Sequence, residues 1–283
     1  MVEPRMYTEE DCKYSATNHP DLLSVEADPR TKNELGWLVG ISYMSPYKGI
    51  FGTGPNLCTF ATDPCIKDCI GYTGRARANE TSSPIHRARE TRRRLFLDDR
   101  DAYFKKLRLE VSALARKADR RGLRLAVRLN GTTDVLWETY PAFLALQSEF
   151  PSVMWYDYTK VPIRHRSGFS GHLTFSWSGE NEEECRLAIL AGHNIAVPYH
   201  GQFPLVDTVG GITLKVVNGD ESDLRFLDRG THPQPVIVGL RIVEISTKRR
   251  NKDDTPSFGR RTSSEALLTD RLKSLLAKTN ANG

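Results

Sequence analysis

Residues 123–131 read LRLAVRLNG, a short apolar run with a polar turn at its end. Gly122 precedes the run and ends a predicted helix over 100–121, because glycine commonly follows the last helical residue. The asparagine and glycine at 130 and 131 are typical of a turn. The stretch therefore predicts a buried strand that is entered from a helix and left through a polar turn.

The same order recurs on both sides of this strand. Further helices are predicted over 83–97, 141–150 and 181–192, with proline or acidic residues in their first turns. Apolar runs suited to buried strands lie at 36–44, 153–158, 172–179, 194–199, 212–217 and 236–242. Strands and helices in alternation favour parallel strands joined by helices. The predicted fold class is α/β, with mostly parallel strands in a partial or complete (β/α) barrel.

The alternating pattern occupies residues 36–245, and we expect one barrel-like domain there. A polar leader is predicted over 1–35, a flexible linker over 246–264 and a C-terminal helix over 265–283. No window approaches the roughly 18 uninterrupted apolar residues that a bilayer span needs, so no membrane contact is expected. The acidic, polar start predicts a cytoplasmic protein, with its thiols reduced.

Charge permits contact with nucleic acid without requiring it. The chain carries a formal net charge of +5. Residues 82–96, SSPIHRARETRRRLF, place Arg89, Arg92 and Arg93 on one predicted helix. Two interpretations remain open, a solvated helix face and a surface that binds phosphates.

Three of the five cysteines lie close together in a loop predicted over 54–78. Cys58, Cys65 and Cys69 have the spacing C-x6-C-x3-C, and an odd total argues against a disulfide framework. Thiolates suit zinc or an iron–sulfur cluster, and three of them leave one position open. The sequence leaves three interpretations: a [4Fe–4S] cluster with one open iron, a zinc site with a further ligand, and thiols that are buried or redox-active.

Polar residues follow the predicted strands at their carboxyl ends, where the sites of α/β proteins lie. Turn or cap roles would explain any one of them, but their joint position beside the cysteine loop favours a site. These residues are Asn130, Gly131, Asp134, Asp157, Tyr158, Lys160, Ser176, Ser178, Tyr199, His200, Asn218, Gly219, Asp220 and Asp223.

Several stretches in combination resemble an uncharacterised bacteriophage family, the gene-product-88-like proteins. They include NLCTFATDPCIKDCIGYTGRAR (56–77), LAVRLNGTTDVLWE (125–138), WYDYTK (155–160) and LTFSWSGENEEECRLAILAGHNIAVPY (173–199). The resemblance covers about residues 36–245. It implies a phage protein in the cytoplasm of an infected bacterial host, and it implies no chemistry.

A cysteine triad after the first barrel strand and a glycine-containing turn after the second are similar to radical S-adenosylmethionine enzymes. The resemblance implies that the three cysteines ligate a [4Fe–4S] cluster and that S-adenosylmethionine chelates its open iron. It also implies cosubstrate-binding roles for Asn130, Gly131, Asp134, Ser176 and Ser178. That superfamily usually has the spacing C-x3-C-x2-C with an aromatic residue before the last cysteine, whereas this chain has Asp68 there.

The resulting hypothesis is an iron–sulfur enzyme that takes a hydrogen atom from its substrate. Asp134, Asp157 and Lys160 are the predicted catalytic residues. The predicted substrate-binding residues are Asp220, Asp223, Arg225, Tyr199 and His200. If the basic helix is functional, the substrate is a nucleotide or DNA that undergoes modification.

Two other hypotheses belong to different classes. In the first, a zinc-containing barrel acts on a nucleobase, with Asp134 or Asp157 as the nucleophile and another carboxylate as the acid or base. In the second, a non-enzymatic phage protein with a structural metal binds nucleic acid through Arg89, Arg92 and Arg93.

Overall fold

The computed structural model describes residues 6–25, 36–67, 69–72, 83–228, 235–242 and 259–261. The predicted C-terminal helix over 265–283 and most of the predicted linker lie outside these residues. Part of the predicted leader, residues 6–25, is among the described residues. It contains the 3-10 helix η1 (Glu10–Cys12) and the strand β1 (Leu23–Val25), and β1 pairs with the first strand of the predicted domain.

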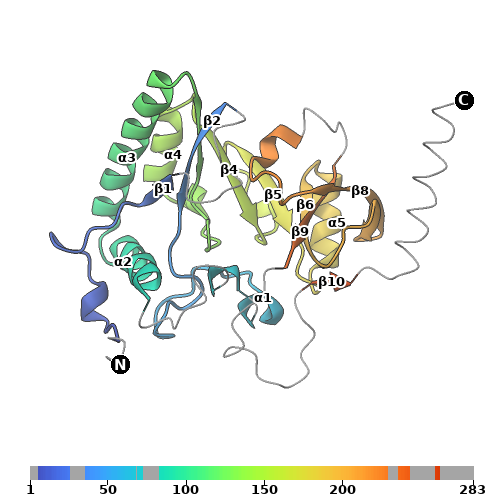
Figure 1. Ribbon diagram of the computed structural model, residues 1–283, viewed down its shortest axis with the longest axis horizontal. Helices are drawn as coiled ribbons and strands as arrows, with labels where there is room; N and C mark the ends of the chain where they lie inside the picture. The colour runs from blue at the N-terminus through green and yellow to red at the C-terminus, as the bar shows by residue number, and fades with distance from the viewer. Residues whose placement is uncertain are drawn as a thin grey trace, which may run out of the picture.

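One mostly parallel sheet organises the chain (Figure 1). Its strand order is β1-β2-β3-β4-β5-β6-β9-β8-β7. The strands from β2 to β6, together with β9 and β8, run parallel, whereas β1 and β7 pair antiparallel at the two edges. The remaining strands are β2 (Trp37–Ser42), β3 (Arg124–Arg128), β4 (Met154–Thr159), β5 (His172–Ser176), β6 (Asn194–His200), β7 (Val206–Val209), β8 (Ile212–Asn218), β9 (Ile237–Arg241) and β10 (Arg260–Arg261), the last of which pairs with β6.

Five consecutive strands, β2 to β6, are also neighbours in space. Right-handed crossovers between such strands place their helices on one face of the sheet, as in (β/α) barrels. The α/β class predicted from the sequence is therefore confirmed. In the described part of the chain, no pairing joins the edge strands β1 and β7, so the observed sheet is open.

The helices begin and end where the sequence predicts. Asp99 separates the first two long helices, and its side chain accepts a hydrogen bond from the Ala102 amide at 2.9 Å. Gly122, with φ at +63°, follows the second. The α-helices are α1 (Asp63–Lys67), α2 (Pro84–Asp98), α3 (Arg100–Arg120), α4 (Pro141–Glu149) and α5 (Glu182–Leu190). Further 3-10 turns are η4 (Ile70–Tyr72), η6 (Trp137–Thr139), η7 (Ile163–His165) and η8 (Arg225–Leu227).

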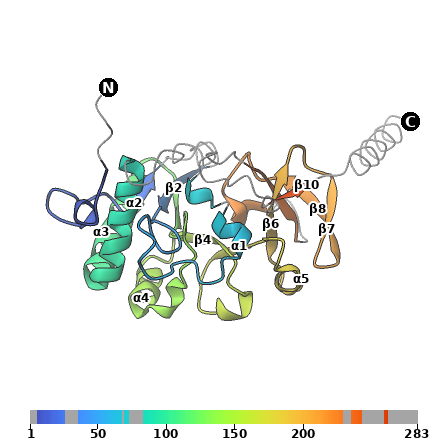
Figure 2. The ribbon, with the colours of Figure 1, turned by 90° about the horizontal axis from the view of Figure 1, so that it is seen from below.

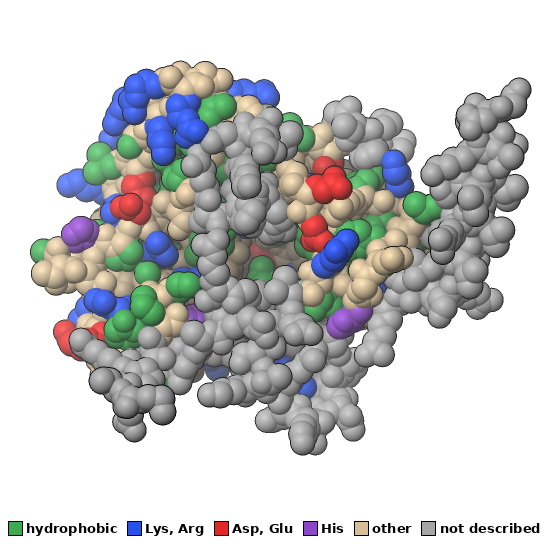
Figure 3. Space-filling view, viewed as in Figure 1, with side chains coloured by type: hydrophobic (Ala, Val, Ile, Leu, Met, Phe, Trp, Pro, Cys, Tyr) green, Lys and Arg blue, Asp and Glu red, His purple; other side chains and the backbone are tan. Residues whose placement is uncertain are grey.

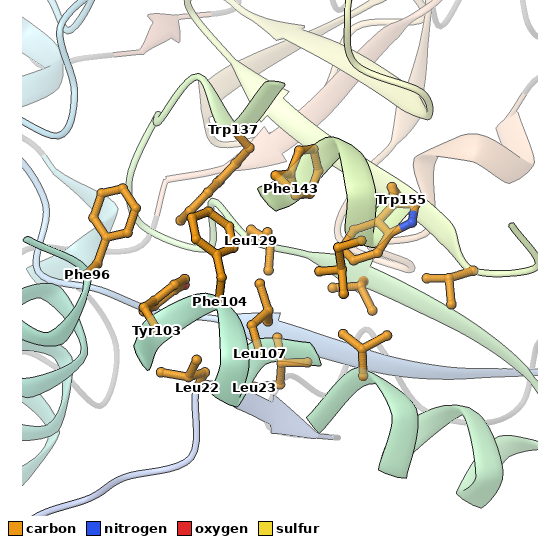
Figure 4. Packing of buried hydrophobic residues seen from close by; sticks show 14 of the residues in the cluster. Leu22, Leu23, Phe96, Tyr103, Phe104, Leu107, Leu129, Trp137, Phe143 and Trp155 are labelled. Atoms are coloured by element: carbon orange, nitrogen blue, oxygen red, sulfur yellow. The ribbon is translucent and has the colours of Figure 1, made fainter. Parts of the chain in front are cut away.

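Aromatic side chains fill the space between the sheet and its helices (Figure 4). Trp137 lies at the centre, with its ring 5.1 Å from Phe96 and stacked on Tyr103 at 5.9 Å. Phe143 from α4 meets Trp155 from β4 edge to face at 5.3 Å. Each such pair adds about 0.5–1.5 kcal/mol beyond the burial of apolar area. This core fixes α3 and α4 against β2, β3 and β4.

The opposite face of β2, β3 and β4 is covered by the connection between β8 and β9. Phe226 of η8 packs against Trp37 at 4.8 Å and against Tyr156 at 5.5 Å. Leu224 is buried in the same cluster. Both faces of the central strands are therefore closed, which explains why their sequences are apolar without alternation.

The segment after β2 lies beyond the carboxyl ends of the strands. In Figure 1 its helix α1 lies below the sheet, and in Figure 2, seen from below, α1 lies between β4 and β6. This segment holds the cysteine triad, so the fold brings the thiols to the end of the sheet where the polar turns were predicted.

Candidate functional site

A cavity of about 400 Å³ lies at the carboxyl ends of β3, β4 and β5. All three cysteines of the triad contribute to its wall. The strand-end residues in the wall are Asn130, Gly131, Thr132, Thr133, Asp134, Tyr158, Thr159, Lys160 and Ser176. The cysteine loop and the polar turns, predicted separately, therefore form a single site.

The cysteine loop is connected to the turn after β3 through its backbone. The Asp134 amide donates to the Leu57 carbonyl at 3.0 Å, directly before Cys58. Cys65 lies on α1, and Cys69 directly precedes η4. All three thiols are partly buried. These contacts hold the triad over the ends of the strands.

Each cysteine sulfur has a neighbouring hydrogen-bond donor. The Tyr47 amide donates to Cys58 Sγ at 3.4 Å, and the Gly71 amide donates to Cys69 Sγ at 3.4 Å. The ammonium group of Lys160 forms a side-chain hydrogen bond with Cys65. Donors of this kind stabilise thiolates bound to a metal.

The Cys58 thiol resists ionisation. Burial raises the pKa of Cys58 to about 12, against the lowering effect of the Tyr47 amide, and Cys69 and Asp134 raise it further. A cation that binds at this site must therefore displace the thiol protons. Burial acts to lower the pKa of Lys160, but Cys65 and Asp134 outweigh it and raise that pKa above its usual value. Lys160 is therefore a cation at neutral pH.

The cavity wall brings together three thiols, a donor type that both zinc and iron–sulfur clusters use. Among the described residues, no three His, Cys, Asp or Glu side chains lie close enough together to hold one metal ion. Zn–S bonds are about 2.3 Å long, so thiolates on one zinc ion stand roughly 4 Å apart. A [4Fe–4S] cluster bonds each thiolate to a different iron and spreads its ligands more widely. In either case the candidate ligands in the cavity wall are Cys58, Cys65 and Cys69.

Asn130 is a turn residue whose side chain is fully bonded within the protein. Its amide nitrogen donates to the Val135 carbonyl at 2.9 Å and to Asp157 Oδ2 at 2.6 Å. Its amide oxygen accepts from the Val135 amide at 2.9 Å and from Thr133 Oγ1 at 3.0 Å. These four bonds use its whole capacity. The predicted contact between the Asn130 side chain and a cosubstrate is therefore not supported.

Gly131 is required by the approach of the turn to β2. A Cβ atom there would lie 2.5 Å from the Ser42 carbonyl oxygen. The Gly131 amide donates to that same oxygen at 2.9 Å. Its backbone lines the cavity, whereas the space kept free by the missing side chain faces β2.

Asp134 and Asp157, both predicted as catalytic, occupy different environments. Asp134 lines the cavity and accepts from Thr159 Oγ1 at 2.8 Å and from the Lys160 amide at 2.7 Å. Asp157 is 2% exposed, is not in the cavity wall, and pairs with Arg166 Nη2 at 3.3 Å. Asp157 therefore supports the turn and does not meet a ligand in this cavity.

Sequence reasoning missed two members of this network. Arg166, buried after η7, pairs with Glu138 at 2.5 Å and lies 3.8 Å from Asp134. Glu138 follows the turn after β3 and is also buried. Neither residue directly follows a predicted strand, although Glu138 ends the quoted stretch 125–138, so only the proximity of β4 to that turn reveals them. Arg166 forms ion pairs with the carboxylates of Glu138, Asp157 and Asp134, of which Asp134 lines the cavity.

The two serines after β5 separate in the structure. Ser176 lines the cavity, and its carbonyl accepts from the Asn181 side chain at 2.9 Å. Ser178 is buried outside the wall, and its amide donates to Asn181 Oδ1 at 2.8 Å. Only Ser176 remains a candidate for ligand contact in this cavity.

The predicted substrate-binding set does not reach the cavity wall. Tyr199 is buried and donates to Asp207 at 2.6 Å. Asp223 binds Arg128 at 3.0 Å, on the sheet face covered by η8. None of Tyr199, His200, Asp220, Asp223 and Arg225 lines the cavity. Most of these residues instead join the later strands and η8 by internal bonds, with Asp220 near Arg241 and Arg225 near Asp228.

The arginines of α2 face the protein. Arg93 is 1% exposed and donates to the Tyr47 and Pro55 carbonyls. Arg92 is half-buried and donates to the Tyr43 carbonyl at 3.2 Å, and Arg89 donates to the Gly71 carbonyl. The predicted phosphate-binding surface is wrong for Arg93. The guanidinium groups of Arg89 and Arg92 are thus bound to backbone carbonyls of the segment that follows β2.

Exposed basic side chains instead gather over α3. In Figure 3 they form the blue area at the upper left, where Figure 1 has α3. Its exposed members include Lys105, Arg108, Arg116 and Arg120. Arg108 pairs with Glu149 of α4 at 2.6 Å. This area is a solvated helix face of the kind left open by the sequence.

Comparison with known proteins assigns the chain to a family. No described helix combines the length and apolar composition that a membrane span needs. Neither curated proteins nor solved structures gave a match. The model of one family, described as gene product 88, matches residues 19–254. The protein belongs to the gene product 88 family.

Proposed function

We propose that the protein is an iron–sulfur enzyme resembling radical S-adenosylmethionine proteins. The observation that carries the proposal is the single cavity shared by Cys58, Cys65, Cys69 and the polar turns after β3, β4 and β5. A cysteine triad in the segment after β2, the first parallel strand, is the arrangement implied by the resemblance in the sequence. The proposed fold is accordingly a partial (β/α) barrel.

The three cysteines would hold a [4Fe–4S] cluster with one iron left open. Once reduced by a one-electron donor, such a cluster would supply the electron that cleaves a sulfonium C–S bond of S-adenosylmethionine to methionine and a 5′-deoxyadenosyl radical, and that radical would take a hydrogen atom from a substrate. Aliphatic side chains including Ile50 and Ile66 form part of the wall and would limit the access of water to this chemistry.

Asp134 and Lys160 provide opposite charges within the wall. Asp134 is held by Thr159 Oγ1 and by the Lys160 amide, so its position is set before a ligand arrives. The carboxylate is suited to an ammonium group, and the lysine to a carboxylate or a phosphate. Ser176 adds a hydroxyl group at the end of β5. These residues would orient the cosubstrate and substrate, whereas Asp157 and Arg166 would hold the wall.

A nucleotide, free or in DNA, is the proposed substrate class. The wall contains the aromatic side chains of Tyr47, Phe51 and Tyr158 in addition to its polar groups. Small-molecule sites combine apolar and aromatic walls with a few polar groups, and typically have volumes of about 300–1,000 Å³. Aromatic rings bind a planar base by stacking.

Metal analysis after anaerobic reconstitution tests the proposal. We expect about four iron and about four sulfide per wild-type chain, as the composition of one cubane requires. Cys58→Ala, Cys65→Ala and Cys69→Ala should each lower both values, whereas Cys185→Ala, in the buried contacts of α5, should retain them. Tight zinc without iron in the wild-type chain would contradict the proposal and favour the zinc-containing barrel.

A further inference from the structure

Two arginines of α2 bind backbone carbonyls in the segment between β2 and the end of η4 (residues 43–72), which we call the cysteine segment. The two carbonyls lie far apart in this segment. Arg93 donates to the Tyr47 carbonyl at 3.1 Å. Arg89 donates to the Gly71 carbonyl. The two arginines are four residues apart, so they project from the same side of α2 one turn from each other.

The residues held by these arginines are the same two that donate amide hydrogens to cysteine sulfur. The Tyr47 amide reaches Cys58 Sγ, and the Gly71 amide reaches Cys69 Sγ, both at 3.4 Å. Cys58 and Cys69 thus each accept a hydrogen bond from the amide of a residue whose carbonyl accepts from an arginine of α2. The same arrangement therefore occurs at Tyr47, before the first cysteine of the triad, and at Gly71, after the last.

Tyr47 adopts a backbone conformation that needs such support. Its φ is +50°, and it is the only non-glycine residue with positive φ among the described residues. Left-handed backbone is unfavourable for a residue with a side chain. The Leu57 amide donates to the same carbonyl as Arg93, at 3.0 Å. Two donors on one carbonyl therefore hold Tyr47 in the conformation that directs its amide to Cys58.

The second donor is packed against the first. A Cβ atom on Gly71 would lie 2.9 Å from Cγ of Pro46, the residue before Tyr47. The two amide donors are thus held in adjacent parts of one structure, and only glycine permits the approach at position 71.

The glycines of the loop make room for Arg93. A Cβ atom on Gly49 would lie 2.8 Å from Arg93 Nε, and one on Gly54 would overlap Arg93 Nη2. Glu90 lies 3.6 Å from Arg93 and accepts from the Ile50 amide at 3.2 Å. The loop is therefore closed around a buried ion pair, which is costly unless it is fully bonded.

We infer that Arg89 and Arg93 are positioning residues of the thiolate site, which act on the metal centre through the Gly71 and Tyr47 amides. This inference rests on the proposed function, because it assigns a role in holding the same cluster. Hydrogen bonds to ligand sulfur tune the potential of iron–sulfur clusters, and residues that orient metal ligands strengthen binding. Arg89 and Arg93 of the basic segment thus serve the cysteines.

Conservative variants of the full chain test the inference. We compare Arg89→Lys and Arg93→Lys with Arg87→Lys, a control on the same helix whose guanidinium donates to the Asp11 carbonyl at 3.0 Å. Lysine keeps the charge and loses the planar set of donors. In the reconstituted protein, both test variants should lose iron to a chelator about 10–100-fold faster and have a more negative midpoint potential. The control should match the wild-type chain. Arg89→Lys is informative even if the buried Arg93→Lys variant does not fold.

The outcomes of this experiment distinguish failure of the inference from failure of the proposed function. If the wild-type chain holds a cluster and both variants match the control in iron loss and potential, the inference alone is overturned. If the chain takes up Co²⁺ through thiolates but forms no cluster, the proposed function fails. The inference is then decided by the thiolate-to-cobalt absorption band, which should weaken in the test variants only. Binding of neither metal overturns both.

Discussion

Asp157 is a carboxylic acid enclosed by protein, at 2% exposure. Burial raises its pKa to about 7, although Arg166 at 3.3 Å opposes the shift. An aspartate in an unfolded chain has a pKa of about 3.9. Between these values the folded protein keeps a proton that the unfolded chain has lost. The contribution of Asp157 to stability is therefore fully present below about pH 4 and is lost as the pH rises to about 7.

Asp157→Asn removes this titration and should change how stability depends on pH. The free energy of unfolding of the wild type, relative to the variant, should fall between pH 5 and 7 by at most about 1.4 kcal/mol per unit. Above pH 8 the difference should be constant. Urea unfolding of both proteins at several pH values measures it, and parallel curves across the whole range would contradict the raised pKa.

Residues of the site could be predicted from the sequence where a side chain suited to ligand binding lay in a loop that follows a predicted strand. Cys58, Asp134, Lys160 and Ser176 share the cavity because loops at the carboxyl ends of parallel strands converge. The role of Asn130 was not predictable, because its bonds depend on groups five and 27 residues away. A polar residue in a sequence does not reveal whether its capacity is already used.

At the scale of elements, the turn after β3 is held against the end of β2. Gly131→Ala would bring its Cβ within 2.5 Å of the Ser42 carbonyl, and backbone cannot move as readily as a side chain. We expect a loss of about 1–3 kcal/mol in the free energy of unfolding. The comparison is Gly40→Ala in β2, where the nearest atom is the flexible end of Leu114 at 3.0 Å. Denaturant unfolding should show a smaller loss for Gly40→Ala, and equal losses would contradict the account.

Helix α4 offers two neighbouring apolar residues with opposite environments. Phe143 is fully buried between Trp137 and Trp155, whereas Leu144 is 40% exposed. Phe143→Ala should cost about 3–5 kcal/mol, and Leu144→Ala within about 0.5 kcal/mol. Thermal or urea unfolding measures both. Similar costs at the two positions would contradict the orientation of α4 on the sheet.

Elements were predictable from the sequence in proportion to their burial. The central strands have continuous apolar runs because both faces are covered, and the helices carry clear starts and ends. The edge strand β7 is short and mostly exposed, so its sequence has little apolar signal. The sequence left the role of the α2 arginines open, because helix periodicity does not tell which face of a helix meets a loop.

On the scale of the whole molecule, the order of strands determines the site. Because β2 to β6 follow one another in the chain and in the sheet, their carboxyl ends form one continuous edge. The cysteine segment crosses this edge, and α2 holds that segment from the side by Arg89 and Arg93. Sequence alternation predicted this edge, whereas the bonds that hold the segment depend on tertiary contacts.

The most direct test of the central claim is the electron paramagnetic resonance spectrum of the reduced, anaerobic protein before and after S-adenosylmethionine is added. Three cysteine ligands leave one iron open, so the account predicts a [4Fe–4S] signal whose g values shift when the cosubstrate binds. A cluster signal that S-adenosylmethionine leaves unchanged, or the absence of any cluster signal in reconstituted protein, would contradict it.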